Sequence, residues 1–187
     1  MTPDSKDLLI AACQNDIAQM RALLDAGVDP NAVDPEIGHS ALYNATRTDH
    51  VDAIRTLVRM GADPNLRLNY RSPIDRRKEC GVVALMYAIS LDAAKSLVEG
   101  GAAINVADDS GVTSLIRAAH RGKEDIVRFL LDAGADPRRK TRGGLSASDV
   151  VQSQIAKYES WVQGGDRTPI ADKVERLTRI HKMLTEG

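Results

Sequence analysis

The apolar residues of this chain recur as short helical stripes separated by turn residues. In the segment 108–137, one face of each of two short helices is apolar, at Leu115, Ala118 and Ala119 and then at Ile126, Val127, Leu130 and Leu131. Thr113 precedes the first stripe, where its hydroxyl can cap a helix. Gly122 and Gly134 follow the two stripes, where glycine takes the left-handed conformation that ends helices. The segment therefore predicts a turn followed by two helices.

Copies of this unit lie on either side of it, as expected because a single unit cannot bury its own apolar faces. Its ending, Ala-Gly-Ala-Asp-Pro at 133–137, has counterparts at 26–31, 61–65 and 101–105. Its opening turn, which begins at Gly111, has counterparts at 38–42, 81–85 and 144–147. Asn15 and Asp49 stand at the position of Gly122 between the helices, and both residue types tolerate the left-handed conformation.

These motifs resemble the ankyrin repeat, whose pattern runs D-x-x-G-x-T-P-L-H-x-A-A-x-x-G, then V-V-x-x-L-L, then G-A-D-x-N. The similarity covers roughly residues 6–151. The chain departs from the family at the T-P-L-H tetrapeptide, which reads T-S-L-I from Thr113 and S-A-L-Y from Ser40. The resemblance implies an all-α ankyrin-repeat solenoid of about five helix-turn-helix repeats with an extended C-terminal helical cap. It also implies binding to a partner protein through inner helices and projecting turns.

The repeats predict one ankyrin-repeat domain over residues 1–187, divided by the positions of the turns. The predicted parts are an N-terminal capping repeat at 3–31, a second repeat at 32–65, a third at 66–105, a fourth at 106–137 and a C-terminal repeat at 138–187. The last part has two long apolar stripes, which predict helices that cap the open end of the solenoid. Trp161, the single tryptophan, is expected in the core of this cap.

The third repeat differs from the others in three ways. An inserted loop of about ten extra residues lies within 66–80, the turn between its helices is shortened, and Val83 replaces the capping hydroxyl. The loop contains five bases and two acids: Arg67, Arg71, Arg76, Arg77, Lys78, Asp75 and Glu79. Long loops inside compact domains are usually functional. We therefore expect this loop to select a partner with an acidic surface patch.

Composition narrows the function further. No apolar run is long enough to span a membrane, and the acidic N-terminus does not have the pattern of a signal peptide. Cys13 and Cys80 have no metal-ligand spacing, so both are expected as free thiols in a reducing cytoplasm. The four histidines likewise lack ligand spacing, and no phosphate-binding or nucleophile motif occurs. We therefore predict a cytoplasmic protein that is not an enzyme and has no cofactor or metal, and that is monomeric alone.

Two classes of partner remain. Protein recognition is favoured, through an adaptor or through an inhibitor such as a bacterial immunity protein. Nucleic acid is the alternative, because bases cluster at 67–78 and 138–142, although the net charge of −1 argues against it. The family's contact positions correspond here to Glu36, Ile37, His39, Arg47, Thr48, Arg71, Arg76, Arg77, Asp109, Val112, His120, Arg121, Arg142 and Leu145.

Overall fold

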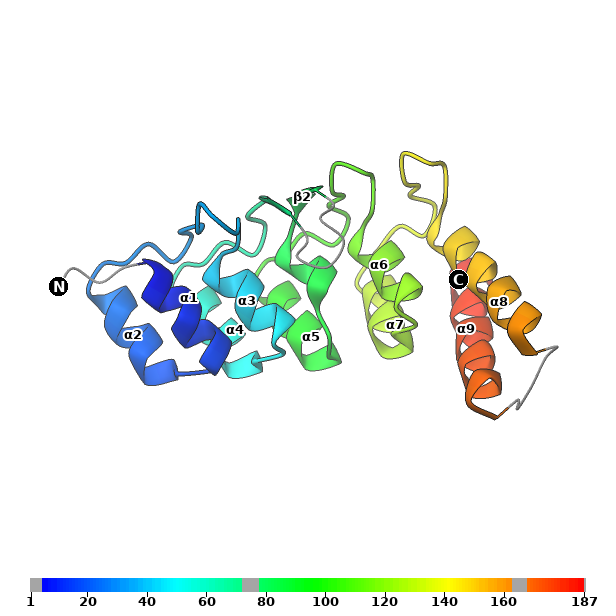
Figure 1. Cartoon of the computed structure of the whole chain (residues 1–187), viewed down its shortest axis with the longest axis horizontal. Helices are drawn as coiled ribbons and strands as arrows, with labels where there is room; N and C mark the ends of the chain where they lie inside the picture. Colours follow the sequence, from blue (N-terminus) through cyan, green and yellow to red (C-terminus); the bar gives the residue numbers. More distant parts are fainter. Residues whose placement is uncertain (1–4, 72–77, 163–167, 187) are drawn as a thin grey trace. The chain divides into compact units, whose positions relative to one another are not determined.

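The computed structural model describes residues 5–71, 78–162 and 168–186, and the chain divides into two compact units, Met1–Asp109 and Ser110–Gly187. Most of the described residues are helical (Figure 1). The first unit contains α1 (Ser5–Gln14), α2 (Ile17–Asp25), α3 (Ala41–Arg47), α4 (Val51–Arg59), β1 (Leu68–Arg71), β2 (Lys78–Val82), the 3-10 helix η1 (Ala84–Tyr87) and α5 (Leu91–Glu99). The second contains α6 (Ser114–His120), α7 (Glu124–Asp132), α8 (Ala147–Val162) and α9 (Thr168–Glu186).

Side-chain caps and left-handed residues set the helix boundaries, as the sequence predicts. The Ser40 hydroxyl accepts a hydrogen bond from the Tyr43 amide at 3.2 Å and begins α3. Thr113 does the same for α6. Between paired helices, Asn15, Asp49 and Gly122 have φ values of 58°, 60° and 68°. The prediction of left-handed backbone at all three positions is therefore confirmed.

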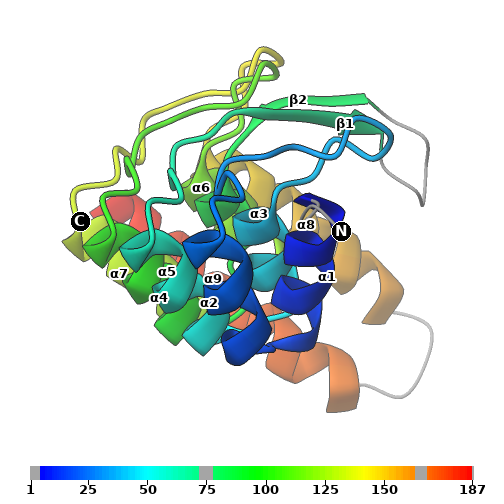
Figure 2. The ribbon, with the colours of Figure 1, turned by 90° about the vertical axis from the view of Figure 1, so that its left-hand side faces the viewer.

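In the first unit, successive helix pairs pack in two parallel rows. The inner row consists of α1, α3 and η1, and the outer row consists of α2, α4 and α5 (Figure 2). Buried alanines such as Ala11, Ala45 and Ala93 let neighbouring helices approach closely. The asparagines Asn31 and Asn65 link successive repeats: Asn31 accepts from the Asp63 amide at 2.7 Å, and Asn65 accepts from the Ala103 amide at 2.7 Å. This repetition explains why Asn recurs after Asp-Pro.

The third repeat is altered, and its insertion is more ordered than a loop. The predicted shortening of the turn between its helices is wrong, because residues 88–90 connect them just as residues 48–50 connect α3 and α4, and the missing residues are lost from the first helix instead. Its first helix is reduced to the four residues of η1, and Val83 makes no side-chain cap. The inserted segment was expected as a loop at 66–80, but its ends form an antiparallel hairpin of β1 and β2. Leu68 pairs with Val82, and a bulge follows at Asn69. Buried Leu68 and Tyr70 hold β1 on the protein, which explains why these residues form a strand.

In the second unit, the predicted long helices α8 and α9 pack against each other and against α6 and α7. Ser146 and Asp149 form a capping box at the start of α8, with the Ser146 amide donating to the Asp149 carboxylate at 2.8 Å and the Asp149 amide donating to the Ser146 hydroxyl at 3.2 Å. Leu177, Ile180 and Leu184 bury the apolar face of α9. The expectation for Trp161 concerns a side chain outside the described part of the structure.

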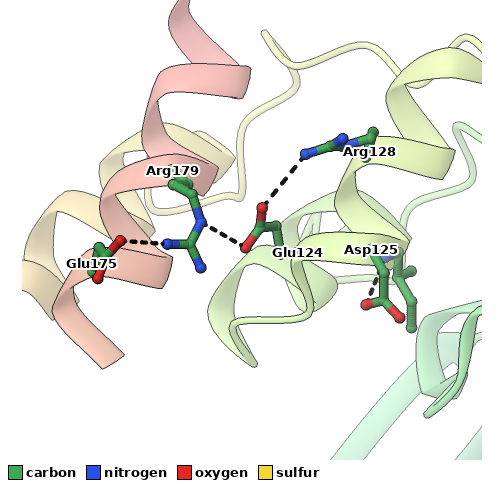
Figure 3. Close-up of polar contacts among 6 residues, drawn as sticks. Glu124, Asp125, Arg128, Glu175 and Arg179 are labelled. Carbon is green, nitrogen blue, oxygen red and sulfur yellow. Dashed lines mark hydrogen bonds and ion pairs between the residues drawn. The ribbon is translucent and has the colours of Figure 1, made fainter. Parts of the chain in front are cut away.

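Ion pairs also connect α9 to α7. The Glu124 carboxylate on α7 binds Arg179 of α9 at 3.0 Å and Arg128 at 3.5 Å (Figure 3). Arg179 in turn binds Glu175 at 2.9 Å, one turn earlier on α9. All four side chains are partly or largely exposed, so we expect these ion pairs to orient α9 more than they stabilise it.

Candidate functional site

The turn at residues 33–40 projects from the inner row of the first unit and holds two predicted contact residues outward. The Asp34 carboxylate accepts hydrogen bonds from the amides of Glu36 at 2.8 Å and Ile37 at 3.1 Å. These bonds stabilise the charged form and lower the pKa of Asp34. The backbone closes the turn through a bridge between Val33 and Ser40. Ile37 is consequently left 47% exposed at the tip.

His39, also predicted as a contact residue, lies at the base of this turn and is mostly buried. Its Nδ1 lies 3.1 Å from Oδ1 of Asn44, and its ring packs edge-on against Tyr70 with a centroid distance of 4.9 Å. Burial lowers the pKa of His39, and the nearby charge of Arg47 lowers it further. A neutral ring is therefore expected here at physiological pH, and it lines the cleft described below.

Three tyrosines form a buried chain of hydroxyl groups between the second repeat and the hairpin. Tyr43 donates to Tyr70 at 2.7 Å, Tyr70 donates to Tyr87 at 2.6 Å, and Tyr87 donates to the Glu79 carboxylate at 2.6 Å. Burial raises the pKa of both Tyr43 and Tyr70 well above the usual value. Tyr70 belongs to β1 and Glu79 to β2, so this chain of hydroxyl groups holds both strands against η1 and α3.

This tyrosine chain was not foreseen as a unit from the sequence. Tyr43 stands at the last position of the S-A-L-Y segment and is buried with 1% exposure. A signal was present, because three of the four tyrosines fall in the second and third repeats. Their meeting depends on the pairing of β1 with β2, which the sequence alone does not determine.

A cleft of about 350 Å³ separates the turn from the hairpin. Its lining residues come from both segments: Pro35, Glu36, Ile37, Gly38, His39, Asn69, Tyr70 and Lys78. Figure 2 shows the turn and the hairpin side by side above the helices. At the bottom they touch so closely that a side chain on Gly38 would collide with the Asn69 carbonyl and the Tyr70 side chain. The structure thus brings Glu36, Ile37 and His39 together at one site.

The other predicted contact residues of the first unit lie beside this cleft or apart from it. Arg47 is exposed, and its guanidinium lies 5.8 Å from the Tyr43 ring. Thr48 is exposed at the end of α3, where its hydroxyl donates to the Asn44 carbonyl at 2.9 Å. Asp109 pairs with Arg67 at 3.1 Å and is not part of the cleft lining. The backbone of Arg71 lies in β1, whereas its side chain and residues 76 and 77 lie outside the described part.

The second unit carries the remaining predicted contact residues. His120 and Arg121 are exposed at the end of α6, and Val112 is partly exposed in the turn before it. Burial of one side of its ring lowers the pKa of His120. Arg142 donates its amide to the Ser110 carbonyl at 2.8 Å, which joins two successive turns, and Leu145 is 49% exposed.

The described residues offer little support for other chemistry. They contain no group of three or more His, Cys, Asp or Glu side chains that could hold a metal ion. Among them there is also no helix with the length and hydropathy needed to cross a membrane. Tyr70, an aromatic residue in the first basic segment, is 7% exposed and its hydroxyl is engaged by Tyr43 and Tyr87, so most of its ring is not available for stacking on a nucleic-acid base. Cys13 and Cys80 are both free.

The paired helices, left-handed connections and projecting turns define a helical repeat protein of the solenoid class. Comparison with known families agrees, since the model for ankyrin repeats (3 copies) matches residues 1–68 and 67–141. The chain belongs to the ankyrin-repeat family, whose repeats are protein-interaction modules. The predicted fold class, an all-α repeat solenoid, is confirmed.

Individual relatives share the repeats within much longer proteins. Ankyrin repeat and SOCS box protein 6 of Homo sapiens is 30% identical over 153 residues, covering 78% of this chain and 34% of that protein. BRCA1-associated RING domain protein 1 of Caenorhabditis elegans is 31% identical over 164 residues, covering 80% of this chain and 22% of that protein. The mitochondrial disaggregase of Bos taurus is 29% identical over 154 residues, covering 81% and 22% respectively. The chain thus spans about a third or less of the length of these relatives.

Proposed function

We propose that this chain binds another protein through its projecting turns and inner-row helices, acting as an adaptor or as an inhibitor or immunity protein. The observation that carries the proposal is the cleft of the first unit, where the predicted contact residues Glu36, Ile37 and His39 meet the inserted hairpin. An insertion that is built into the structure by buried hydrogen bonds, and that also borders a cleft, is better suited to recognition than a tolerated surface loop. The other predicted contact residues would extend this surface.

The partner we propose carries an acidic surface patch. The inserted segment contains Arg67, Arg71, Arg76, Arg77 and Lys78 against only Asp75 and Glu79. Arginine pairs bidentately with carboxylates, which suits such a surface. We further propose that the chain is a monomer alone and acts in the cytoplasm, where two free cysteines stay reduced.

Affinity capture from the native cell, followed by cross-linking mass spectrometry, tests the proposal by identifying the partner and the contacted residues. The purified pair is then compared with the double variant Arg76→Glu and Arg77→Glu. We expect binding to weaken by about 2 kcal/mol or more, the range of interface hot spots. Because attractive charges are removed, binding should also become less sensitive to salt.

The matched control reverses two exposed bases on outer-row helices, Arg21→Glu and Lys95→Glu, and so changes the net charge equally. This control should bind like the parent chain. Equal binding by the parent and the Arg76→Glu, Arg77→Glu variant at low salt would contradict the role of the inserted segment. Cross-links confined to the outer row would contradict the proposed surface as a whole.

A further inference from the structure

The cleft between the 33–40 turn and the hairpin has the form of a socket for one side chain. Its volume is about 350 Å³, and it is open at the rim and closed below by His39 and Tyr70. These two floor residues are 9% and 7% exposed, and their rings meet edge to face. Ring faces and edges of this kind form the apolar base of many binding pockets.

The wall formed by the turn is unusually apolar for such an exposed segment. Ile37 is one of five large hydrophobic residues that the described structure leaves exposed. Its neighbour Pro35 is exposed too, and both line the cleft. Leaving Ile37 at 47% exposure costs solubility without stabilising the fold. An apolar side chain of a partner that covered Ile37 would bury both apolar side chains.

The charges around the rim favour an acidic neighbour for that apolar side chain. Glu36 already pairs with Lys6 at 3.5 Å, and the Asp34 carboxylate accepts two backbone hydrogen bonds. On the opposite wall stands Lys78, which is exposed and makes no ion pair with the described residues. A carboxylate of the ligand would therefore find a cation here, whereas a basic group of the ligand would have to compete with Lys6 for Glu36.

The socket is also held in shape before any ligand arrives. The turn is closed by Asp34, the two walls touch at Gly38, and the tyrosine chain fixes both strands of the hairpin. A preformed site loses little conformational entropy on binding, which is a general route to affinity from a small contact area.

We infer that this cleft receives one large apolar side chain from a segment of the partner protein that carries an Asp or Glu beside it. The apolar side chain lies between Ile37 and the His39–Tyr70 floor, and the carboxylate pairs with Lys78. This inference rests on the proposed function, since it names the chemistry that the partner presents to one part of the surface.

A phage-displayed library of short random peptides, selected on the whole chain, tests the inference without knowledge of the partner. Enriched peptides should share a large apolar residue with an adjacent Asp or Glu. Their binding should weaken by at least about tenfold, or about 1.4 kcal/mol, in Ile37→Asp and in Lys78→Glu. In the parent chain, amide NMR signals of residues 36–39, 69, 70 and 78 should shift on binding.

The matched control variants are Ile89→Asp, in the connection between η1 and α5, and Lys95→Glu, on α5, both of which alter exposed residues of the same types. They should bind the selected peptides like the parent, and circular dichroism melting should show that all four variants fold. Selection of basic peptides, selection of none, or equal binding by Ile37→Asp would overturn the inference. If cross-linking still maps a partner to the turns in that case, the proposed function stands and only the socket is wrong.

Discussion

At the scale of single residues, Gly38 carries a constraint that no other residue type satisfies. Its φ of 70° disfavours any side chain, and a Cβ there would collide with the Asn69 carbonyl. Gly27 offers a matched comparison, because its φ is 90° but no atom lies within 4 Å of an added Cβ. Comparing an added side chain at these two positions therefore separates the cost of backbone strain from the cost of the collision between the turn and the hairpin.

We therefore predict that Gly38→Ala lowers the free energy of unfolding by more than Gly27→Ala does. Strain at a left-handed position costs about 1 kcal/mol, and forced displacement of packed atoms adds about 1–3 kcal/mol at residue 38 alone. Urea denaturation followed by circular dichroism measures both variants. Equal losses would mean that the hairpin moves aside without cost, and that the cleft is not fixed at its base.

The tyrosine chain gives a second prediction at this scale, concerning alkaline pH. Burial raises the folded-state pKa of Tyr43 and Tyr70 above the unfolded value of about 10. Their protons are therefore held more tightly when folded, so this contribution to stability is complete below about pH 10 and is lost as pH rises further. We expect the free energy of unfolding to fall over that window, with tyrosinate absorbance appearing together with loss of helix signal.

Tyr70→Phe should reduce the fall in the free energy of unfolding at alkaline pH, whereas Tyr158→Phe should show the same fall as the parent chain. At neutral pH, Tyr70→Phe should also cost about 1–3 kcal/mol, since Tyr43 and Tyr87 each lose a hydroxyl partner. Tyr158 is half-buried on α8 and lies outside this chain of hydroxyl groups. Identical alkaline profiles for the two variants would be incompatible with a shared buried network.

At the scale of elements, the sequence predicted helices well and the hairpin poorly. The left-handed residues Asn15, Asp49 and Gly122 separate paired helices as predicted, because left-handed residues and apolar spacing are local signals. The insertion was located correctly, but its strands were not foreseen. Their order depends on Leu68 and Tyr70 packing against η1 and α3, which are distant in sequence.

The same reasoning explains how much of the site was foreseen. Turn and inner-row positions follow from the repeat, so Glu36, Ile37 and His39 could be selected without coordinates. The cleft could not be predicted, because Lys78 and Asn69 line it only when β1 and β2 pair in the observed register. His39 was also expected as a surface contact, whereas the Tyr43 and Tyr70 rings pack against it and it is only 9% exposed.

The weakened first helix of the third repeat leads to a prediction about local stability. η1 is a single 3-10 turn without a side-chain cap, whereas the corresponding α6 has seven residues and is capped by Thr113. A missing cap alone costs about 1 kcal/mol. Native-state hydrogen exchange should therefore show amides of residues 84–88 opening at lower free energy than those of 116–120. Equal protection would show that the tyrosine chain compensates fully for the short helix.

At the scale of the whole molecule, the two ends of a repeat array need different solutions, because a terminal repeat exposes a face that internal repeats bury. In this chain we propose that α8 and α9 supply the C-terminal solution, the role that the sequence predicts for them. They cover α6 and α7 through the buried residues Val151, Leu177 and Ile180 and through the ion pairs of Glu124. The apolar contacts contribute most of the stabilisation of this packing, since the side chains of the ion pairs are partly or largely exposed.

Leu177→Ala should accordingly lower the free energy of unfolding by about 2–5 kcal/mol, the range for deleting a buried leucine side chain. Leu177 is fully buried on α9, whereas Leu145 is 49% exposed, so Leu145→Ala is the matched control and should change little. A more severe change removes residues 145–187 and uncovers the apolar faces of α6 and α7 together. That shortened chain should aggregate or lose cooperative thermal melting. If it instead stays soluble and melts like the parent, and Leu177→Ala is neutral, then α8 and α9 are an appendage and the repeats carry their own stability.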